Sequence, residues 1–305
     1  MSTEPATDDA RRRIAERVVG RERELELALA AVEAGRDLVL EGPPGTSKTT
    51  MLQAITSEWG IPLILVEGNA DLSPTKLIGH HSPVRVLRED YSPENFIAGP
   101  LVRAMQDGGF LYIEEFNRAP EDTLNTLLTA MADRRIEIPR VGTIEAAPSF
   151  RVIASMNPFD NVGTTRLSTS ISDRLNRIVV AYQDAAAEEQ IVARRSGLTG
   201  ALASPIAADA VAVTRLTRVH AQLRQGSSVR GAIDLALIAD RLLAGRGIVS
   251  EEDPRYAAAM LDGMLVALSG RIRVDEASGR TAEDILREIW LHHFHEAEGA
   301  AAAPG

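Results

Sequence analysis

The sequence predicts an α/β fold in which helices cover a parallel sheet, followed by an all-helical region. Two observations lead to this prediction. Short apolar runs alternate with helical patterns up to residue 184, and alanine- and leucine-rich helical stretches then continue to about residue 295. We therefore expect an α/β domain at 1–184, a helical lid domain at 185–297 and a disordered tail at 298–305.

The expected strands are five short apolar runs, most of them ended by glycine, proline or charged residues. Such continuous runs are typical of strands that are buried on both faces of a parallel sheet. A helix is expected from Arg21 to Ala34, because its leucines recur among charged residues and alanines before Gly35. A second helix is expected at 49–59. The predicted strands are 37–41, 62–67, 110–113, 150–155 and 178–181.

The composition is that of a globular protein, with 45% hydrophobic and 25% charged residues in a chain of 305. The net charge of -10 opposes contact with a nucleic-acid backbone, and the sequence shows no basic cluster that would offset it. The absence of cysteine excludes disulfides, cysteine zinc sites and a thiol nucleophile. Since no signal-peptide pattern or long apolar run is present, we expect a cytoplasmic protein with no membrane contact.

A glycine-rich loop follows the first predicted strand. Residues Gly42 to Thr49 read Gly-Pro-Pro-Gly-Thr-Ser-Lys-Thr. Glycines let backbone N–H groups turn toward phosphates, and a helix N-terminus adds the positive end of its dipole. Lys48 would neutralise phosphate oxygens and Thr49 would bind Mg²⁺. Ser47 replaces the last glycine of the usual G-x-x-x-x-G-K-[ST] pattern, which we interpret as tolerated variation.

Two adjacent carboxylates, Glu114 and Glu115, follow the predicted strand at 110–113. Ligands of open parallel sheets bind at the carboxyl ends of the strands, so this is a Walker B arrangement. Glu114, in place of the usual aspartate, is expected on the metal side and Glu115 is expected to activate water. The next strand ends in Asn157, whose amide is suited to orienting water near the γ-phosphate.

These residues resemble the MoxR-type AAA+ ATPases, and the resemblance extends from about Val18 to Asp253. It rests on strings beyond the loop and the Walker B strand, including a Glu-Phe-Asn-Arg-Ala-Pro signature. They are Phe96-Ile-Ala-Gly-Pro-Leu101, Glu115-Phe-Asn-Arg-Ala-Pro120, Leu127-Leu-Thr-Ala-Met131, Ile153-Ala-Ser-Met-Asn-Pro158, Ser172-Asp-Arg174 and Gly226-Ser-Ser-Val-Arg230.

The resemblance implies roles for single residues. Asn157 would be sensor 1, Arg230 sensor 2, and Arg174 an arginine finger that acts on a neighbour's nucleotide, with Arg177 as the alternative finger. The implied cofactors are ATP and Mg²⁺, the latter bound at Thr49 and Glu114. The implied nucleotide contacts are Val19, Gly20, Gly42, Pro43, Pro44, Gly45, Thr46, Ser47, Lys48, Thr49 and Met51.

The resemblance also implies partners. Members of the family are usually hexameric rings that remodel client proteins or assist metal-cofactor insertion, commonly with a von Willebrand factor A domain protein. The segment 69–99 matches an insertion that contacts clients. The loop sequence Glu-Gly-Pro-Pro-Gly-Thr-Ser-Lys-Thr resembles that of family members associated with molybdenum-dependent carbon monoxide dehydrogenase.

Three other functions remain open at the level of the sequence. A nucleic-acid motor or loader could use the same fold, although the acidic charge opposes it. A small-molecule kinase would not require sensor and finger residues in this order. A nucleotide-dependent binding switch with little turnover is compatible with the two departures from the usual motifs, Ser47 and Glu114.

Overall fold

The structure is a computed structural model that describes residues 8–89, 91–157 and 167–296. The tail predicted at 298–305 lies outside the described residues. The chain divides into two compact units, Met1–Ala181 and Tyr182–Gly305.

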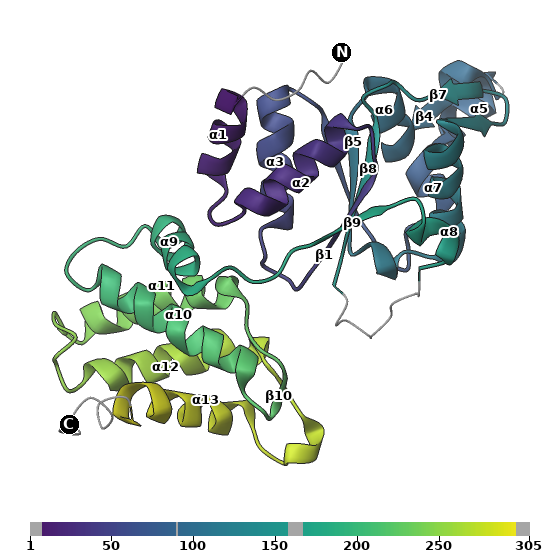
Figure 1. Cartoon of the computed structure of the whole chain (residues 1–305). Helices are drawn as coiled ribbons and strands as arrows, with labels where there is room; N and C mark the ends of the chain where they lie inside the picture. The colour runs from purple at the N-terminus through teal and green to yellow at the C-terminus, as the bar shows by residue number, and fades with distance from the viewer. Residues whose placement is uncertain (1–7, 90, 158–166, 297–305) are drawn as a thin grey trace. The chain divides into compact units, whose positions relative to one another are not determined.

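A five-stranded parallel sheet forms the centre of the first unit, with the strand order β2-β5-β8-β1-β9 (Figure 1). The predicted α/β fold with a parallel sheet is therefore confirmed. Because β1 lies between β8 and β9, the segment that follows β1 adjoins the segments that follow those two strands. The strands are β1 (Leu38–Glu41), β2 (Leu63–Glu67), β5 (Phe110–Glu114), β8 (Arg151–Met156) and β9 (Asn176–Val179).

Strand β5 shows why the central strands are apolar along their whole length. Phe110 and Tyr112 belong to the core on one face of the sheet, whereas Leu111 and Ile113 belong to the core on the other face. Successive side chains of a strand point to opposite faces, so a strand covered on both sides has no position for a solvated residue. All four side chains are fully buried.

Helices cover both faces of this sheet (Figure 1). On one face, residues of α1 (Asp8–Arg17), α2 (Glu22–Glu33) and α3 (Lys48–Trp59) enter the same core as Phe110 and Tyr112. On the other face, α6 (Pro100–Asp107) and α7 (Glu121–Asp133) pack on Leu111 and Ile113. The shorter helices are α4 (Pro74–Ile78), α5 (Pro83–Glu89) and α8 (Thr169–Ser172).

Two antiparallel strand pairs complete the first unit, and neither was predicted from the sequence. The first pairs β3 (Gly79–His81) with β4 (Phe96–Ala98), inside the segment interpreted as an insertion. The second pairs β6 (Arg135–Ile138) with β7 (Gly142–Glu145). Their strands have three or four residues, which is too short for an alternating pattern to stand out.

The second unit packs its helices around one apolar core. A short antiparallel pair joins β10 (Leu223–Gln225) to β11 (Arg273–Val274). The expected helical region is therefore confirmed, and the short strand pair is an addition that the sequence did not predict, because strands of two or three residues carry no recognisable pattern. The helices are α9 (Ala185–Ser196), α10 (Ala203–Val219), α11 (Val229–Gly245), α12 (Tyr256–Leu268) and α13 (Ala282–Leu291), followed by a π-helical turn at His292–Glu296.

Candidate functional site

The glycine-rich loop joins β1 to α3 at the carboxyl edge of the sheet. Gly42 passes so close to β9 that an added Cβ would lie 2.0 Å from the carbonyl oxygen of Val180, so only glycine fits there. Gly45 and Ser47 both have left-handed backbone conformations, with φ of 76° and 65°. The motif position that usually carries glycine thus has the conformation that favours glycine, and Ser47 adopts it at an energetic cost.

Lys48 is the first residue of α3, and its side chain folds back over the loop. The ammonium Nζ donates hydrogen bonds to the carbonyl oxygens of Gly42 and Pro43, both at 2.8 Å, and to the Thr46 hydroxyl at 3.3 Å. The lysine charge therefore lies beside the N-terminus of α3. Both features favour the binding of an anion at this loop.

Thr49 and the Walker B strand meet at the same place. The Thr49 hydroxyl donates a hydrogen bond to Oε1 of Glu114 and lies 3.3 Å from the Tyr112 hydroxyl. The Tyr112 hydroxyl in turn donates to the Ser155 hydroxyl at 3.0 Å. Burial raises the pKa of Tyr112 to about 12, so its hydroxyl keeps the proton that this bond requires. Tyr112 and Ser155 could not be singled out from the sequence, because both look like ordinary strand residues.

A hydroxyl and a carboxylate oxygen are thus brought together at Thr49 and Glu114. Mg²⁺ prefers oxygen ligands of this kind, and it keeps several waters when it is held by few protein groups. The residues present therefore suit a Mg²⁺ ion that is shared with the phosphates of a nucleotide.

Glu115 follows Glu114 in a left-handed conformation, with φ of 51°. This turn directs the two carboxylates differently: Glu114 is half-buried against Thr49, whereas the Glu115 side chain is 47% exposed. The Glu115 carboxylate forms an ion pair of 3.1 Å with Arg118. Gly68 is needed beside this turn, since an added Cβ would lie 2.5 Å from the carbonyl oxygen of Glu115.

Asn157 directly follows β8, at the same edge of the sheet as the loop. Its neighbour Met156 pairs with Glu41, and the backbone N–H of Gly42 donates to the carbonyl oxygen of Met156 at 3.0 Å. The strand order therefore places Asn157 next to the start of the phosphate loop, and its side chain is half-buried there.

The two arginines considered as fingers have different surroundings. Arg177 lies in β9 and binds both carboxylate oxygens of Glu41 in its own chain, at 2.5 Å each. Arg174 is exposed and donates to the carbonyl oxygen of Ser170 at 2.9 Å. Both side chains are exposed, but Arg177 is paired with a carboxylate, whereas this contact of Arg174 is with a carbonyl oxygen one turn away on the same segment.

The remaining expected nucleotide contacts differ in exposure. Val19 is half-buried, Gly20 has a left-handed φ of 62°, and Pro44 is exposed. The Met51 side chain is fully buried in the core formed by α1, α2 and α3. Met51 therefore helps to pack α3, the helix that follows the loop, into this core.

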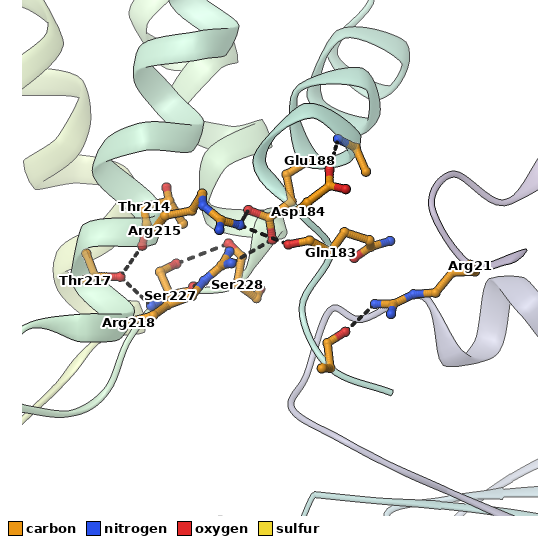
Figure 2. A network of polar contacts seen from close by, with 12 residues as sticks. Arg21, Gln183, Asp184, Glu188, Thr214, Arg215, Thr217, Arg218, Ser227 and Ser228 are labelled. Atoms are coloured by element: carbon orange, nitrogen blue, oxygen red, sulfur yellow. Dashed lines mark hydrogen bonds and ion pairs between the residues drawn. The ribbon is translucent and has the colours of Figure 1, made fainter. Parts of the chain in front are cut away.

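Arg230 lies in the second unit, as the second residue of α11, and is exposed. The turn before α11 is held by α10: Nε of Arg218 donates to the carbonyl oxygen of Ser227 at 2.8 Å, and the Thr217 hydroxyl accepts from the Ser227 N–H at 2.9 Å. These bonds fix the start of the helix that carries Arg230 (Figure 2).

A buried carboxylate anchors this turn to α9 (Figure 2). Glu188 is 1% exposed and forms ion pairs with Arg218 at 2.6 Å and Arg215 at 3.3 Å. The Arg218 guanidinium also lies 3.8 Å from the centre of the Tyr182 ring. The sequence analysis missed this network, since its members are about 30 residues apart in the chain and no local pattern connects them.

The strand order, the phosphate loop after β1 and the paired carboxylates after β5 define a P-loop NTPase of the AAA+ class. A family model described as an AAA domain of the dynein-related subfamily matches residues 37–175. The denitrification regulatory protein NirQ of Stutzerimonas stutzeri is 30% identical over 261 residues, which cover 80% of this chain and 89% of that protein. This chain belongs to the MoxR-like AAA+ ATPases.

Two further proteins are similar to this chain. The gas vesicle ATPase GvpN of Ancylobacter aquaticus is 29% identical over 277 residues, or 85% of this chain and 73% of that protein. The RuvB Holliday junction branch migration motor of Thermotoga maritima has a similar structure, with a TM-score of 0.52, 19% identity and coverage of 81% of this chain and 70% of RuvB. At this identity the likeness to RuvB shows the fold alone.

Over the described ranges, no helix combines the length and the apolar character that crossing a bilayer requires.

Proposed function

We propose that this protein hydrolyses ATP with Mg²⁺ and uses the energy to remodel a client protein. The observation that carries the proposal is the meeting of Thr49 and Glu114 beside the phosphate loop, with Glu115 at the next position. In P-loop enzymes, a metal ion held by such a hydroxyl and carboxylate neutralises charge between the β- and γ-phosphates. The proximity of Thr49, Glu114 and Glu115 at the carboxyl edge of the sheet supports this proposal.

Each residue of this site has a distinct task. Lys48 exchanges its hydrogen bonds with the loop carbonyls for bonds to phosphate oxygens. Glu115 accepts a proton from the attacking water, and its exposed carboxylate leaves room for that water. Asn157 orients the water from the neighbouring strand end.

Arg174 and Arg230 complete the site in this proposal. Arg174 is assigned to reach the nucleotide of a neighbouring copy, because Arg177, which is also exposed, is engaged by Glu41 of its own chain. Arg230, in helix α11 of the lid domain, acts as sensor 2 and contacts the bound nucleotide. A finger supplied by the next subunit makes hydrolysis depend on assembly, which agrees with the hexameric rings that are typical of AAA+ proteins.

The names of two relatives bear on the kind of client. NirQ is named as a denitrification regulatory protein, and GvpN as a gas vesicle ATPase. We propose that this chain acts on a client enzyme, by assisting the insertion of its metal cofactor or its maturation. A molybdenum-dependent carbon monoxide dehydrogenase is our specific candidate, together with a von Willebrand factor A domain partner, and both rest on the resemblance of the loop.

A trap variant tests this proposal. Glu115→Gln should bind ATP, hydrolyse it at least a hundredfold more slowly than wild type, and retain its client during a pull-down. The matched control is Glu115→Gln combined with Lys48→Ala, which cannot hold the nucleotide and should release the client. ATP hydrolysis by Glu115→Gln at the wild-type rate would show that Glu115 does not activate water.

A binding switch with little turnover is the second candidate, because Ser47 strains the loop and Glu114 replaces the usual aspartate. Both candidates predict nucleotide binding, so only turnover separates them. Wild-type protein that binds ATP and releases less than one phosphate per chain over hours, both alone and in assembled rings, would favour the switch.

A further inference from the structure

The first unit contains a second polar pocket, at the opposite edge of the sheet from the phosphate loop. Its volume is about 620 Å³. Its lining includes residues at the starts of the parallel strands β1, β8 and β9, namely Asp37, Arg151 and Asn176. Asp37 in this pocket and Gly42 in the loop are five positions apart in the chain, which is roughly 16 Å at the rise of a strand.

Positive charge is concentrated in this pocket, although the whole chain carries a net charge of -10. Four arginines and two aspartates contribute to its lining. They are Arg36, Arg134, Arg151, Arg174, Asp37 and Asp173.

Arg151 is the most buried of the four arginines that line the pocket. It is only 6% exposed, and its Nη1 donates to the carbonyl oxygens of Pro148 and Phe150, whereas its Nε is buried without any hydrogen-bond partner. A buried guanidinium donor without an acceptor is costly, so the positive charge of Arg151 is poorly compensated inside the protein and an anion in the pocket would stabilise it. Gly35 lies close to the Nη2 end of this guanidinium, since an added Cβ at Gly35 would lie 3.2 Å from Nη2.

Arg134 brings a second, partly buried guanidinium to the same place. It binds the carbonyl oxygens of Phe150 and Ala147, both at 2.9 Å. Burial and the neighbouring Arg134 lower the pKa of Arg151, while Asp37 opposes this change. Asp37 accepts a hydrogen bond from the Val152 N–H at 2.7 Å. Within the described part of the chain, its carboxylate forms no ion pair with Arg134 or Arg151.

We propose that this pocket binds a phosphate oxyanion. Guanidinium groups suit phosphate because their planar donors match its oxygens, and Arg36 and Arg174 provide further donors at the exposed side of the pocket. The phosphate comes either from solution or from a nucleotide held by a neighbouring copy. Arg174 belongs both to this pocket and to the proposed function, whereas Arg36 and Arg151 belong to the pocket alone.

The test measures binding of inorganic phosphate to Lys48→Ala protein by calorimetry, without nucleotide, so that the phosphate loop does not contribute. We expect saturable binding. Adding Arg151→Gln should weaken it about tenfold or more, and adding Arg36→Gln about threefold. Arg103→Gln removes a charge of the same sign from an exposed position on α6 and should leave the affinity for phosphate unchanged.

A variant with the opposite effect guards against loss of folding. Asp37→Asn keeps an oxygen that can accept the Val152 N–H and removes a negative charge beside the arginines. We expect phosphate to bind about three- to tenfold more tightly. No saturable binding in Lys48→Ala protein, or equal affinities for Arg36→Gln and Arg103→Gln, would overturn the proposal.

The source of the phosphate is resolved with wild-type protein that is saturated with a non-hydrolysable ATP analogue. If free phosphate is the ligand, it still binds the assembled protein. If a neighbour's nucleotide supplies the phosphate, binding of free phosphate disappears on assembly and persists in the monomer. Absence of binding in both states would contradict the pocket itself. None of these results requires hydrolysis, so a protein without ATPase activity would refute the proposed function and leave this inference standing.

Discussion

Ser47 provides a direct test of how the phosphate loop is built. It has a left-handed φ of 65°, it precedes α3, and its hydroxyl does not cap that helix. The left-handed conformation costs an L-residue about 1–2 kcal/mol, and glycine is free of this cost. Glycine also gives the unfolded chain more freedom, which costs about 0.4–1 kcal/mol of stability. Ser47→Gly should therefore stabilise the first unit by about 0.5–1 kcal/mol.

The assay is urea unfolding followed by tryptophan fluorescence. The chain has two tryptophans: Trp59 packs against the core of the first unit, and Trp290 against that of the second. A Trp290→Phe background therefore leaves a signal from the first unit alone. Ser47→Ala is the matched control, because it removes the hydroxyl and keeps the strained conformation.

The two variants should separate. We expect Ser47→Gly to be more stable than wild type and Ser47→Ala to show no gain. Equal free energies of unfolding for the glycine and alanine variants would refute the claim that backbone strain is present at Ser47.

Three other predictions follow from the described contacts. Tyr112→Phe removes the hydroxyl beside Thr49 and should raise the Mg²⁺ concentration needed for half-maximal ATP binding about three- to tenfold; an unchanged Mg²⁺ titration would show that this hydroxyl does not position the site. Glu188→Gln leaves two arginines without their carboxylate, and it should lower the free energy of unfolding of the second unit in urea by about 2–4 kcal/mol. The neighbouring variant Glu189→Gln should change this free energy by less than about 0.5 kcal/mol. Similar losses in both variants would contradict the role of the buried ion pairs. Lys48→Ala should weaken ATP binding at least about tenfold in a fluorescent-nucleotide titration, and wild-type affinity would refute the assignment of the loop.

Much of the central sheet could be predicted from the sequence, because burial on both faces demands apolar side chains throughout a strand. Phe110 to Ile113 is such a case: each residue enters a core, and the charged pair Glu114 and Glu115 begins where the strand leaves it. The phosphate loop was equally visible, since its chemistry depends on adjacent residues.

The parts that escaped prediction depend on residues far apart in the chain. Glu188 meets Arg218 across 30 residues, and Thr49 meets Tyr112 across 63. No local pattern marks such pairs, because each partner is acceptable in its own helix or strand. The conformation of Ser47 also needed the structure: its small size suggested tolerance, whereas its positive φ shows strain.

The choice between Arg174 and Arg177 shows how the structure narrows a prediction that the sequence leaves open. Both arginines lie near the start of β9 and are equivalent as residue types. The ion pair between Arg177 and Glu41 engages one of them, so Arg174 becomes the proposed finger.

ATP hydrolysis by mixed rings tests the central claim most directly. Arg174→Ala and Glu115→Gln subunits should each be inactive alone, and mixing them should restore activity, because some interfaces then combine an intact Glu115 with an intact Arg174 from the neighbour. With random mixing at equal amounts, about a quarter of the interfaces should be complete, since each position is filled correctly half of the time. Activity near that fraction of wild type is the expected result. No recovery in rings that are shown to be mixed would contradict a site shared between neighbouring copies.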